Sequence, residues 1–324
     1  MIDVSFKDLF HPHRTYDLLS WWWYHKKGTW EHLVDTNRKR ALELQWWRHF
    51  NYKLNLKHPK TFNEKVQWLE AFSDTSLWTK YADKHEVRKY IAECGYADSL
   101  LQEYGVWDKV EDIDFDALPN SFAIKCTHDM GSTMLIKDKS SEFDKDSIVR
   151  LLRWRLNLTY GYDTVEPHYT KIPHRIMAEE LLPQLHDDGN MIPMTDTIDY
   201  KFICFDGKTQ FVLVCYDRNI NSHETVKDIY DIDTWTPLRE VCLERYSHQN
   251  YHPIPRPENL QMMVEMAERL SKGFPEVRVD LYNINGKIYF GELTFTWYGG
   301  RINWLTDEFQ LKLGSEIQLP DLKK

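Results

Sequence analysis

Paired cysteines are the first feature that this sequence lacks. Its five cysteines are odd in number, widely spaced and free of any C-x-x-C pair, at Cys94, Cys126, Cys204, Cys215 and Cys242. A disulfide framework needs an even set, and a structural zinc site needs closely spaced thiolates, so neither is indicated. We therefore expect a protein of the reducing cytoplasm.

Long apolar runs and an excess of positive charge are also absent. No stretch approaches the ~20 apolar residues of a membrane span, and the first residues lack the order of a signal peptide. Lys and Arg number 41 against 50 Asp and Glu, a formal net charge of −9. Because a general nucleic-acid binder needs basic residues in bulk, we expect no nucleic-acid partner. The strings G-x-G-x-x-G and G-x-x-x-x-G-K-[ST] do not occur either.

Aromatic residues, in contrast, are abundant and unevenly placed. They make up 14% of the chain, and six of the 13 Trp fall within residues 1–50. Residues 1–60 carry 11 Lys/Arg against 6 Asp/Glu, so their charge is 11 − 6 = +5, which leaves −9 − 5 = −14 for residues 61–324. The chain therefore consists of a basic, Trp-rich front and an acidic body.

The most apolar short stretch, residues 18–24 (LLSWWWY), is followed at once by His25, Lys26 and Lys27. We favour a helix that docks its Trp face on the body. Aromatic rings beside basic residues are also typical of membrane-interface elements, and such rings pack on sugars. Peripheral membrane association, or acceptor-sugar binding, through residues 1–50 is therefore the alternative.

Start and stop signals predict helices over residues 61–72, 83–95, 141–158 and 257–273. Thr61 and Glu64 form a capping-box pattern. Asp83 is expected to cap the second helix and Gly95 to end it. Pro257 is expected at the first helical position of the last one.

Strands are predicted over residues 121–126, 134–137, 175–182, 198–205, 210–216, 277–284 and 288–295. Asp206-Gly207 and Asn285-Gly286 join two pairs of them as hairpins, because these dipeptides tolerate positive φ in tight turns. Strands in hairpins with separate helices favour an α+β fold with antiparallel sheets over a doubly wound sheet.

Two acidic residues are predicted to face each other on the last hairpin. Asp280 lies 285 − 280 = 5 residues before the turn and Glu292 lies 292 − 286 = 6 after it, so they sit nearly opposite on adjacent strands. Paired carboxylates repel unless a positive group lies between them. A divalent cation that bridges phosphates would satisfy both. Arg278, on the same strand face, offers the alternative of an ordinary ion pair on a solvated surface, and spacing alone does not decide between them.

Isolated cations in apolar surroundings form a second pattern. Lys125 lies within the strand 121–126, where an ammonium needs a partner. The loop 131–133 (Gly-Ser-Thr) follows it and offers N–H groups and hydroxyls suited to phosphate oxygens. Lys84, beside the second helix, and Lys201, inside a strand, add two more cations. Together with two opposed carboxylates, they describe a nucleoside triphosphate and its magnesium better than a protease or redox site.

In this order the pieces resemble the ATP-grasp superfamily: Asp83-Lys84 at a helix start, Lys125 before a small-residue loop, EELL at a strand end, then RVD and GELT on the last hairpin. The strings FNEKVQWL, DFDALP, DYKFICFDGK and RVDLYNINGKIYFGELTF look like its TupA-like branch, associated with teichuronopeptide and other bacterial surface-polysaccharide clusters. The resemblance covers residues 55–320.

The resemblance implies an ATP-grasp fold, in which two α+β lobes with antiparallel sheets grip ATP. It divides the chain into a basic, Trp-rich helical segment at 1–55, the first part of the body at 56–120, a small lobe with the phosphate loop and adenine hinge at 121–182, and a lobe with the metal site at 183–324.

The resemblance also implies roles for individual residues. Contacts to the ATP phosphates are expected from Lys84, Lys125 and the loop residues His128, Gly131, Ser132 and Thr133. The adenine is expected at Glu179, Glu180 and Leu182. Magnesium is expected at Asp280 and Glu292, with Thr294 as a third ligand, and the catalytic cations are Arg278, Lys201 and Arg218.

Two departures from the family pattern stand out. Many members have Asn where this chain has Thr294, two residues after the metal-binding glutamate. The loop after His128 contains fewer glycines than the branch tends to have, and Asp129 brings a negative charge toward phosphate, which is unfavourable unless its side chain points away or helps to hold metal.

The resemblance implies a Mg-ATP-dependent carboxylate–amine ligase that works through an acyl-phosphate. It would join an amino acid or amine to a uronic-acid-containing surface polysaccharide or its precursor, in the cytoplasm or at the inner membrane face. A sugar kinase or a glycosyltransferase of the same pathway is the alternative, since D-x-D strings occur at 112–114 and 231–233. A degenerate ATP-grasp fold without catalysis is the third.

Overall fold

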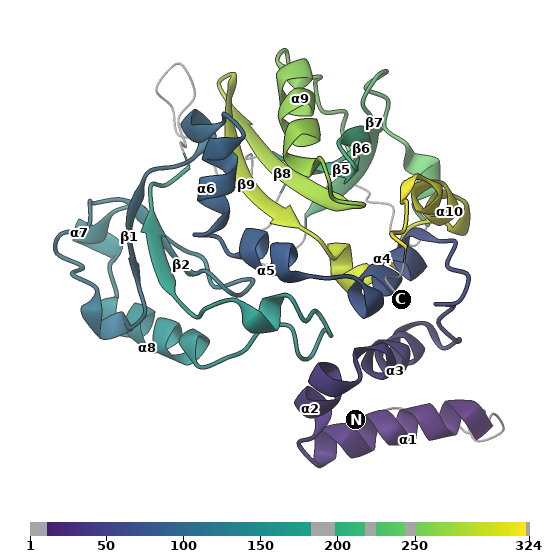
Figure 1. Cartoon of the computed structure of the whole chain (residues 1–324). Helices are drawn as coiled ribbons and strands as arrows, with labels where there is room; N and C mark the ends of the chain where they lie inside the picture. The colour runs from purple at the N-terminus through teal and green to yellow at the C-terminus, as the bar shows by residue number, and fades with distance from the viewer. Residues whose placement is uncertain (1–11, 183–197, 218–224, 244–250, 322–324) are drawn as a thin grey trace.

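The protein is built around two antiparallel sheets, as expected for an α+β chain. The computed structural model describes residues 12–182, 198–217, 225–243 and 251–321 (Figure 1). The smaller sheet has the strand order β1-β4-β2-β3 and the larger has the order β7-β6-β5-β8-β9. The smaller sheet is formed by β1 Glu103–Trp107, β2 Phe122–Cys126, β3 Met134–Ile136 and β4 Ile176–Glu179.

Two hairpins form most of the larger sheet. Its strands are β5 Asp199–Phe205, β6 Lys208–Tyr216, β7 Val226–Asp231, β8 Val277–Ile284 and β9 Lys287–Thr294. Both predicted turns are confirmed: φ is +45° and +82° at Asp206 and Gly207, and +51° and +78° at Asn285 and Gly286. Strands β1 and β7 were not predicted.

The helices before the smaller sheet agree with the sequence signals in part. α4 (Phe62–Phe72) has the complete capping box of Thr61 and Glu64. The predicted helix over 83–95 is wrong at its start, because Asp83 ends α5 (Ser76–Ala82) and its carboxylate accepts from the N–H groups of an intervening turn. α6 (Val87–Glu93) ends as predicted, with φ +93° at Gly95.

Two other predicted helices have different bounds in the structure. The region 141–158 contains a short α7 (Lys139–Glu142) and then α8 (Lys145–Leu156), whose N-cap is Asp144. α9 (Leu260–Ser271) begins three residues after Pro257, which lies in the preceding turn. α10 (Asp307–Glu316) closes the chain. Short 3-10 turns complete the described elements at Ala97–Ser99, Val110–Asp112, Tyr169–Lys171, Arg239–Val241 and Trp297–Gly300.

The helices pack on both faces of the larger sheet. α9 contacts β5, β6 and β8, and the thiol of Cys204 on β5 points to its backbone. On the opposite face, Phe309 of α10 packs edge-on against Phe211 of β6. The smaller sheet has its own apolar cluster with α8, formed around Phe122, Ile124, Ile176 and Leu152. The smaller sheet takes β1 from residues before 121, and the four-part division of the chain stays a prediction.

The N-terminal segment is helical, with α1 (Pro12–Lys26), α2 (Trp30–Thr36) and α3 (Arg38–Phe50). α3 lies between α1 and the body (Figure 1). The predicted docking of the Trp face holds for Trp21, which packs against the core, whereas Trp22 and Trp23 are exposed. No helix among the described residues is long and apolar enough to cross a membrane.

Candidate active site

A cavity of about 390 Å³ lies between the two sheets. Its lining comes from β2, β3 and β4 on one side, from β5, β8 and β9 on the other, and from the segments around α6. Many of the predicted site residues meet there: Lys84, Lys125, Thr133, Glu179, Glu180, Leu182, Lys201, Asp280 and Glu292. Residues far apart in sequence therefore form one charged cavity.

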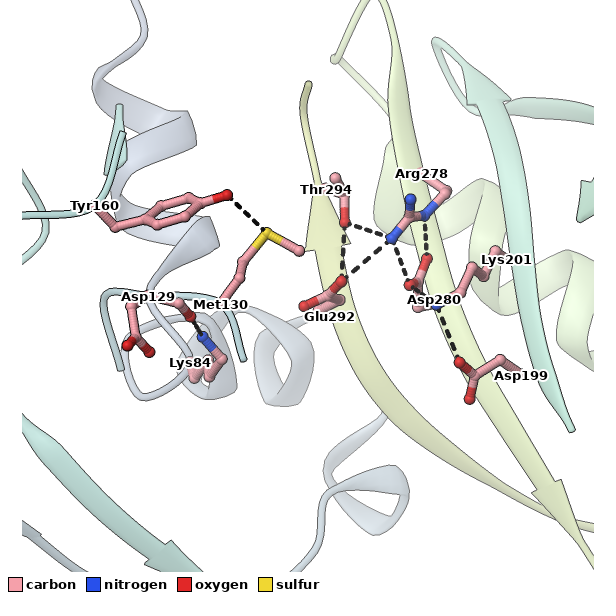
Figure 2. A network of polar contacts seen from close by, with 10 residues as sticks. All are labelled: Lys84, Asp129, Met130, Tyr160, Asp199, Lys201, Arg278, Asp280, Glu292 and Thr294. Carbon is pink, nitrogen blue, oxygen red and sulfur yellow. Dashed lines mark hydrogen bonds and ion pairs between the residues drawn. The ribbon is translucent and has the colours of Figure 1, made fainter. Parts of the chain in front are cut away.

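Asp280 and Glu292 are direct register partners on β8 and β9, as their spacing predicted. Arg278 reaches both carboxylates (Figure 2). Its Nε donates to Asp280 Oδ1 at 2.7 Å, and its Nη2 donates to Asp280 Oδ2 at 2.8 Å and to Glu292 Oε1 at 3.2 Å. Arg278 is 7% exposed, so this pairing lies inside the protein and not on a solvated face.

Lys201 brings a second cation to Asp280. Its Nζ donates to Asp280 Oδ2 at 2.5 Å and lies 3.2 Å from Asp199 Oδ2. Burial alone would raise the pKa of Asp280, but Arg278 and Lys201 outweigh burial and hold that pKa below its ordinary value. Burial acts to lower the pKa of Lys201, but Asp280 raises it above the ordinary lysine value. Both groups are therefore charged at neutral pH.

The charges and atom types of this group suit magnesium. Asp199, Asp280 and Glu292 face Lys201 and Arg278, which gives −3 + 2 = −1. Mg²⁺ prefers hard oxygen ligands and usually binds one or two carboxylates together with phosphate oxygens. No group of three or more His, Cys, Asp or Glu side chains within the described ranges could hold a metal by itself. The acidic pair thus fits an ion that takes some of its oxygen ligands from Asp280 and Glu292 and the others from a bound phosphate.

Thr294 is engaged with its neighbours on β8 and β9. Its hydroxyl accepts from Arg278 Nη2 at 3.0 Å and donates to Glu292 Oε1 at 3.2 Å. The side chain therefore fixes the orientation of Glu292 and Arg278 in this structure. Its role as a third metal ligand stays a prediction.

The cations on the opposite wall are also paired. Lys125 on β2 forms an ion pair with Glu179 at the end of β4, which supplies the partner that an ammonium in this strand requires. Arg88 on α6 lies 3.5 Å from Glu179 and 3.5 Å from Glu103. The sequence analysis missed Arg88, because α6 carries several charges and nothing local distinguishes this one.

The segment after β4 forms an apolar end of the cavity. The strand ends at Glu179 and not at the predicted residue 182. Glu179 already pairs with the ends of both neighbouring strands, so the ladder stops there. The N–H of Glu180 donates to the carbonyl of Gln102 at 2.8 Å. Leu182 then packs in a small apolar cluster with Tyr282.

The loop 127–133 is held in place by polar contacts. Asp129 is 2% exposed, and its carboxylate accepts from the Ser132 hydroxyl at 2.5 Å and lies 3.4 Å from Arg155 Nη1. It is not part of the cavity lining. Lys84 donates to the backbone carbonyl of Asp129 (Figure 2). The loop therefore holds its acidic residue away from the cavity, which removes the electrostatic objection raised by its sequence.

Arg155 on α8 is the second residue that the sequence analysis missed. Besides Asp129, its guanidinium donates to the carbonyls of Met130 at 3.4 Å and Gly131 at 3.2 Å. At the tip of the loop the sulfur of Met130 accepts from Tyr160 Oη at 3.3 Å, and Figure 2 shows the Met130 side chain between Tyr160 and Glu292. The conformation of this loop is thus held by hydrogen bonds, although it has fewer glycines than the family pattern led us to expect.

Other predicted residues do not join the cavity wall. His128 is buried, stacks on His174 at 4.0 Å and bonds to the carbonyl of Leu158. The carbonyl of Gly131 accepts from Arg155, the hydroxyl of Ser132 accepts from the N–H of Cys126, and both residues are absent from the lining. Arg218 lies outside the described residues.

The two D-x-D strings lie in turns. The carboxylate of Asp114 accepts from the N–H groups of Asp116 and Ala117. That of Asp231 accepts from the N–H and hydroxyl of Thr234 at 2.9 Å. These are ordinary turn-stabilising bonds, and nothing at either string favours a sugar-nucleotide site.

Two antiparallel sheets around a cavity of paired acids and cations agree with the ATP-grasp fold that the sequence resemblance implies. The chain belongs to the TupA-like ATP-grasp family, whose model matches residues 64–318. No protein of curated function matches the sequence.

Three of the solved structures that are similar to this chain are ligases by name. One is D-alanine–D-alanine ligase from Helicobacter pylori, with 13% identity over 80% of this chain and 69% of that one and a TM-score of 0.41. L-amino acid ligase from Bacillus licheniformis has 12% identity over 80% and 55%, with a TM-score of 0.43. The ligase PsnB, in a complex with Mg and ADP, has 14% identity over 89% and 73%, with a TM-score of 0.40.

Proposed function

We propose that this protein is a Mg-ATP-dependent carboxylate–amine ligase. The observation that carries the proposal is the convergence of Lys84, Lys125, Lys201 and the Asp280–Glu292 pair on one cavity between two sheets. A triphosphate needs several fixed cations and a metal-binding carboxylate pair, and phosphoryl transfer depends mainly on such positioning and charge neutralisation.

The reaction has two balanced steps. A carboxylate oxygen of the first substrate attacks the γ-phosphorus of ATP, the bond to the β–γ bridging oxygen breaks, and ADP leaves with its electron pair. An amine nitrogen then attacks the acyl carbon and loses a proton, and inorganic phosphate leaves. The products are an amide, ADP and phosphate.

Each residue has a distinct proposed part. Lys84 and Lys125 hold the phosphates under the loop 127–133. Asp280 and Glu292 would hold magnesium, which would supply positive charge to the phosphates of ATP. Arg278 and Lys201 orient the two acids and neutralise charge that develops on the transferring group.

The hinge after β4 is the proposed adenine site. Glu179 would accept from the exocyclic amine, and the backbone of Glu180 and Leu182 would recognise the ring edge. Support comes from the apolar walls around this end of the cavity, which include Leu101, Leu182 and Phe290. When the nucleotide binds, Lys125 exchanges part of its ion pair with Glu179 for a phosphate.

For the substrates, we propose a uronic-acid-containing bacterial surface polysaccharide or its precursor as the carboxylate, and an amino acid or another amine as the nucleophile. The basis is the association of the TupA-like branch with surface-polysaccharide clusters. The enzyme would work in the cytoplasm, with its N-terminal segment toward the inner membrane face.

The experiment compares the parent with Lys125→Met and Glu292→Gln for binding of an ATP analogue and for ADP formation with a uronate and an amine. Lys89→Met is the matched control, because Lys89 lies on α6 with its side chain 76% exposed. Both site variants are expected to lose at least about 100-fold in kcat/KM, and the control nothing. Folded site variants that bind and consume ATP as well as the parent would falsify the proposal.

Product analysis separates the alternatives. An amide with ADP and phosphate supports a ligase. A phosphorylated sugar with ADP identifies a kinase, and a glycoside formed from a UDP-sugar without ATP identifies a glycosyltransferase. ATP binding without any turnover, across a panel of uronates and amines, identifies a non-catalytic protein.

A further inference from the structure

Helix α1 has two chemically different faces over its described side chains. On the inner face, the ring centre of His25 lies 3.9 Å from that of Trp21 and 4.3 Å from that of Trp30 on α2, and both ring pairs are tilted. The guanidinium of Arg48 on α3 lies 4.0 Å from the Trp21 ring centre. These contacts attach α1 to the rest of the N-terminal segment and leave its other side free.

The outer face exposes large apolar groups in one patch. Leu19, Trp22 and Trp23 are 59%, 45% and 47% exposed. They stand at positions i, i+3 and i+4 of the helix and therefore lie side by side. The ammonium groups of Lys26 and Lys27 follow at the next turn, 4.6 Å and 5.5 Å from the ring centres of Trp22 and Trp23. We call these five residues the α1 outer face.

We propose that the α1 outer face docks on a bilayer surface that contains anionic lipid. Burying three large apolar side chains at the interface is favourable, and indole rings with an apolar body and a polar N–H prefer the headgroup region. The two lysines would meet the lipid phosphates, each contributing attraction within a Debye length of the surface. The +5 charge of residues 1–60 adds to this attraction.

The geometry favours a lipid over a sugar ligand. A sugar site usually combines a stacked ring with carboxylate or amide groups that bond to hydroxyls, whereas the polar groups of this patch are ammonium ions. Helix α1 lies at the edge of the molecule (Figure 1), and because a single helix is a rounded rod, a patch along it is convex. A flat, negatively charged surface matches it in shape and charge. Docking there would place a ligase next to a membrane-bound glycan precursor, a consequence that rests on the proposed function.

The test is sedimentation of the full chain with vesicles of phosphatidylcholine, with and without one third phosphatidylglycerol, in the absence of ATP. The parent is expected to bind only the anionic vesicles. The double variant Trp22→Ala/Trp23→Ala, and separately Lys26→Glu/Lys27→Glu, are expected to bind at least about tenfold more weakly. Trp154→Ala is the matched control and should bind like the parent, because Trp154 on α8 is 54% exposed and also lies beside a cation, Arg155.

Three results would overturn this inference: no binding of the parent to anionic vesicles, unchanged binding of both double variants, or binding to a soluble polyuronate but not to vesicles. A dimer that dissociates in the Trp variant, without a change in vesicle binding, would assign the patch to a second copy instead. Because the measurement needs no ATP, a failed ligase assay leaves its result unaffected.

Discussion

At the scale of single residues, Arg278 makes the acidic pair tolerable. Two carboxylates opposite each other on adjacent strands repel, and the desolvation of a buried acid adds to the cost. Arg278 donates to both, and Lys201 donates to Asp280 from the next strand. Asp280 therefore stays ionised, and both carboxylates are held in a fixed orientation in the positions that we propose for the ligands of a divalent ion.

Lys84 gives a prediction for pH dependence. Burial lowers the pKa of Lys84, with Lys125 acting in the same direction and Glu292 opposing it. A lowered pKa means that the ammonium loses its proton at a lower pH than the ~10.4 of an ordinary lysine. Affinity for an ATP analogue should therefore fall as pH rises from 7 toward 10, by up to about tenfold per pH unit above that pKa. In Lys84→Arg, which stays protonated, the fall should move to higher pH.

Calorimetric titration at a series of pH values checks this, with Lys89→Arg on the exposed side of α6 as the control. An alkaline fall at the same pH in the parent and in Lys84→Arg would contradict a role for Lys84 in holding phosphate.

The site residues differ in how visible they are in the sequence. Lys125, Lys201 and Asp280 are charged groups within apolar strands. Because a buried charge needs a partner, their position alone identifies them as candidate site residues. Arg88 and Arg155 lie on helices with several other charges, and their importance comes from partners far away in sequence. Such long-range pairing leaves no local signal, so only the structure identifies these two arginines.

At the scale of elements, the loop 127–133 depends on α8. Arg155→Met removes one guanidinium that bonds to two loop carbonyls and faces the buried Asp129 carboxylate. Because Asp129 would keep only part of its partners, a loss of about 1–3 kcal/mol in unfolding free energy is expected. With the loop mobile, kcat/KM for ATP should fall by about tenfold or more.

Arg153→Met is the control, since Arg153 lies on the same helix but pairs with Glu111 on the surface, where ion pairs contribute little. Urea unfolding and steady-state kinetics measure both effects. Equal losses in the two variants would mean that Arg155 does not position the loop. A double-mutant cycle with Asp129→Asn isolates the energy of this pair.

Elements bounded by characteristic turn residues were predictable from the sequence. Strands that depend on pairing with residues far away in the chain were not. The Asp-Gly and Asn-Gly turns fix two hairpins and the register that brings Asp280 opposite Glu292. β1 and β7 are edge strands of their sheets, only partly buried, and lack the apolar pattern of a central strand. α9 begins later than predicted because the residues from Pro257 onward first form a turn, and their residue types are also common at the start of a helix.

At the scale of the whole molecule, the net charge of −9 is a poor guide to the site. The lining of the cavity has five Lys/Arg against four Asp/Glu, a formal charge of 5 − 4 = +1, so its sign differs from that of the whole chain. The acidic total also includes carboxyl groups whose ionisation is opposed by burial. Glu70, Glu166 and Glu276 are buried, and their pKa values are raised mainly by burial.

Glu276 makes this effect measurable in the stability of the whole molecule. It is fully buried, and neither carboxyl oxygen has a hydrogen-bond partner within the described part of the chain. Burial raises its pKa well above the ordinary value, so the folded state keeps a proton that the unfolded state loses above pH ~4.3. Glu276 therefore does not reduce the free energy of unfolding below that pH. As pH rises from there toward the pKa of the folded state, the free energy of unfolding falls by up to about 1.4 kcal/mol per pH unit.

Glu276→Gln has no proton to lose, so its advantage over the parent in unfolding free energy should grow between pH 5 and pH 8. Glu70 and Glu166 titrate in both proteins and largely cancel from the difference. Glu265→Gln on the exposed face of α9 should show no such growth. Urea unfolding at each pH measures the difference, and a gain independent of pH would mean that Glu276 is already ionised in the folded protein.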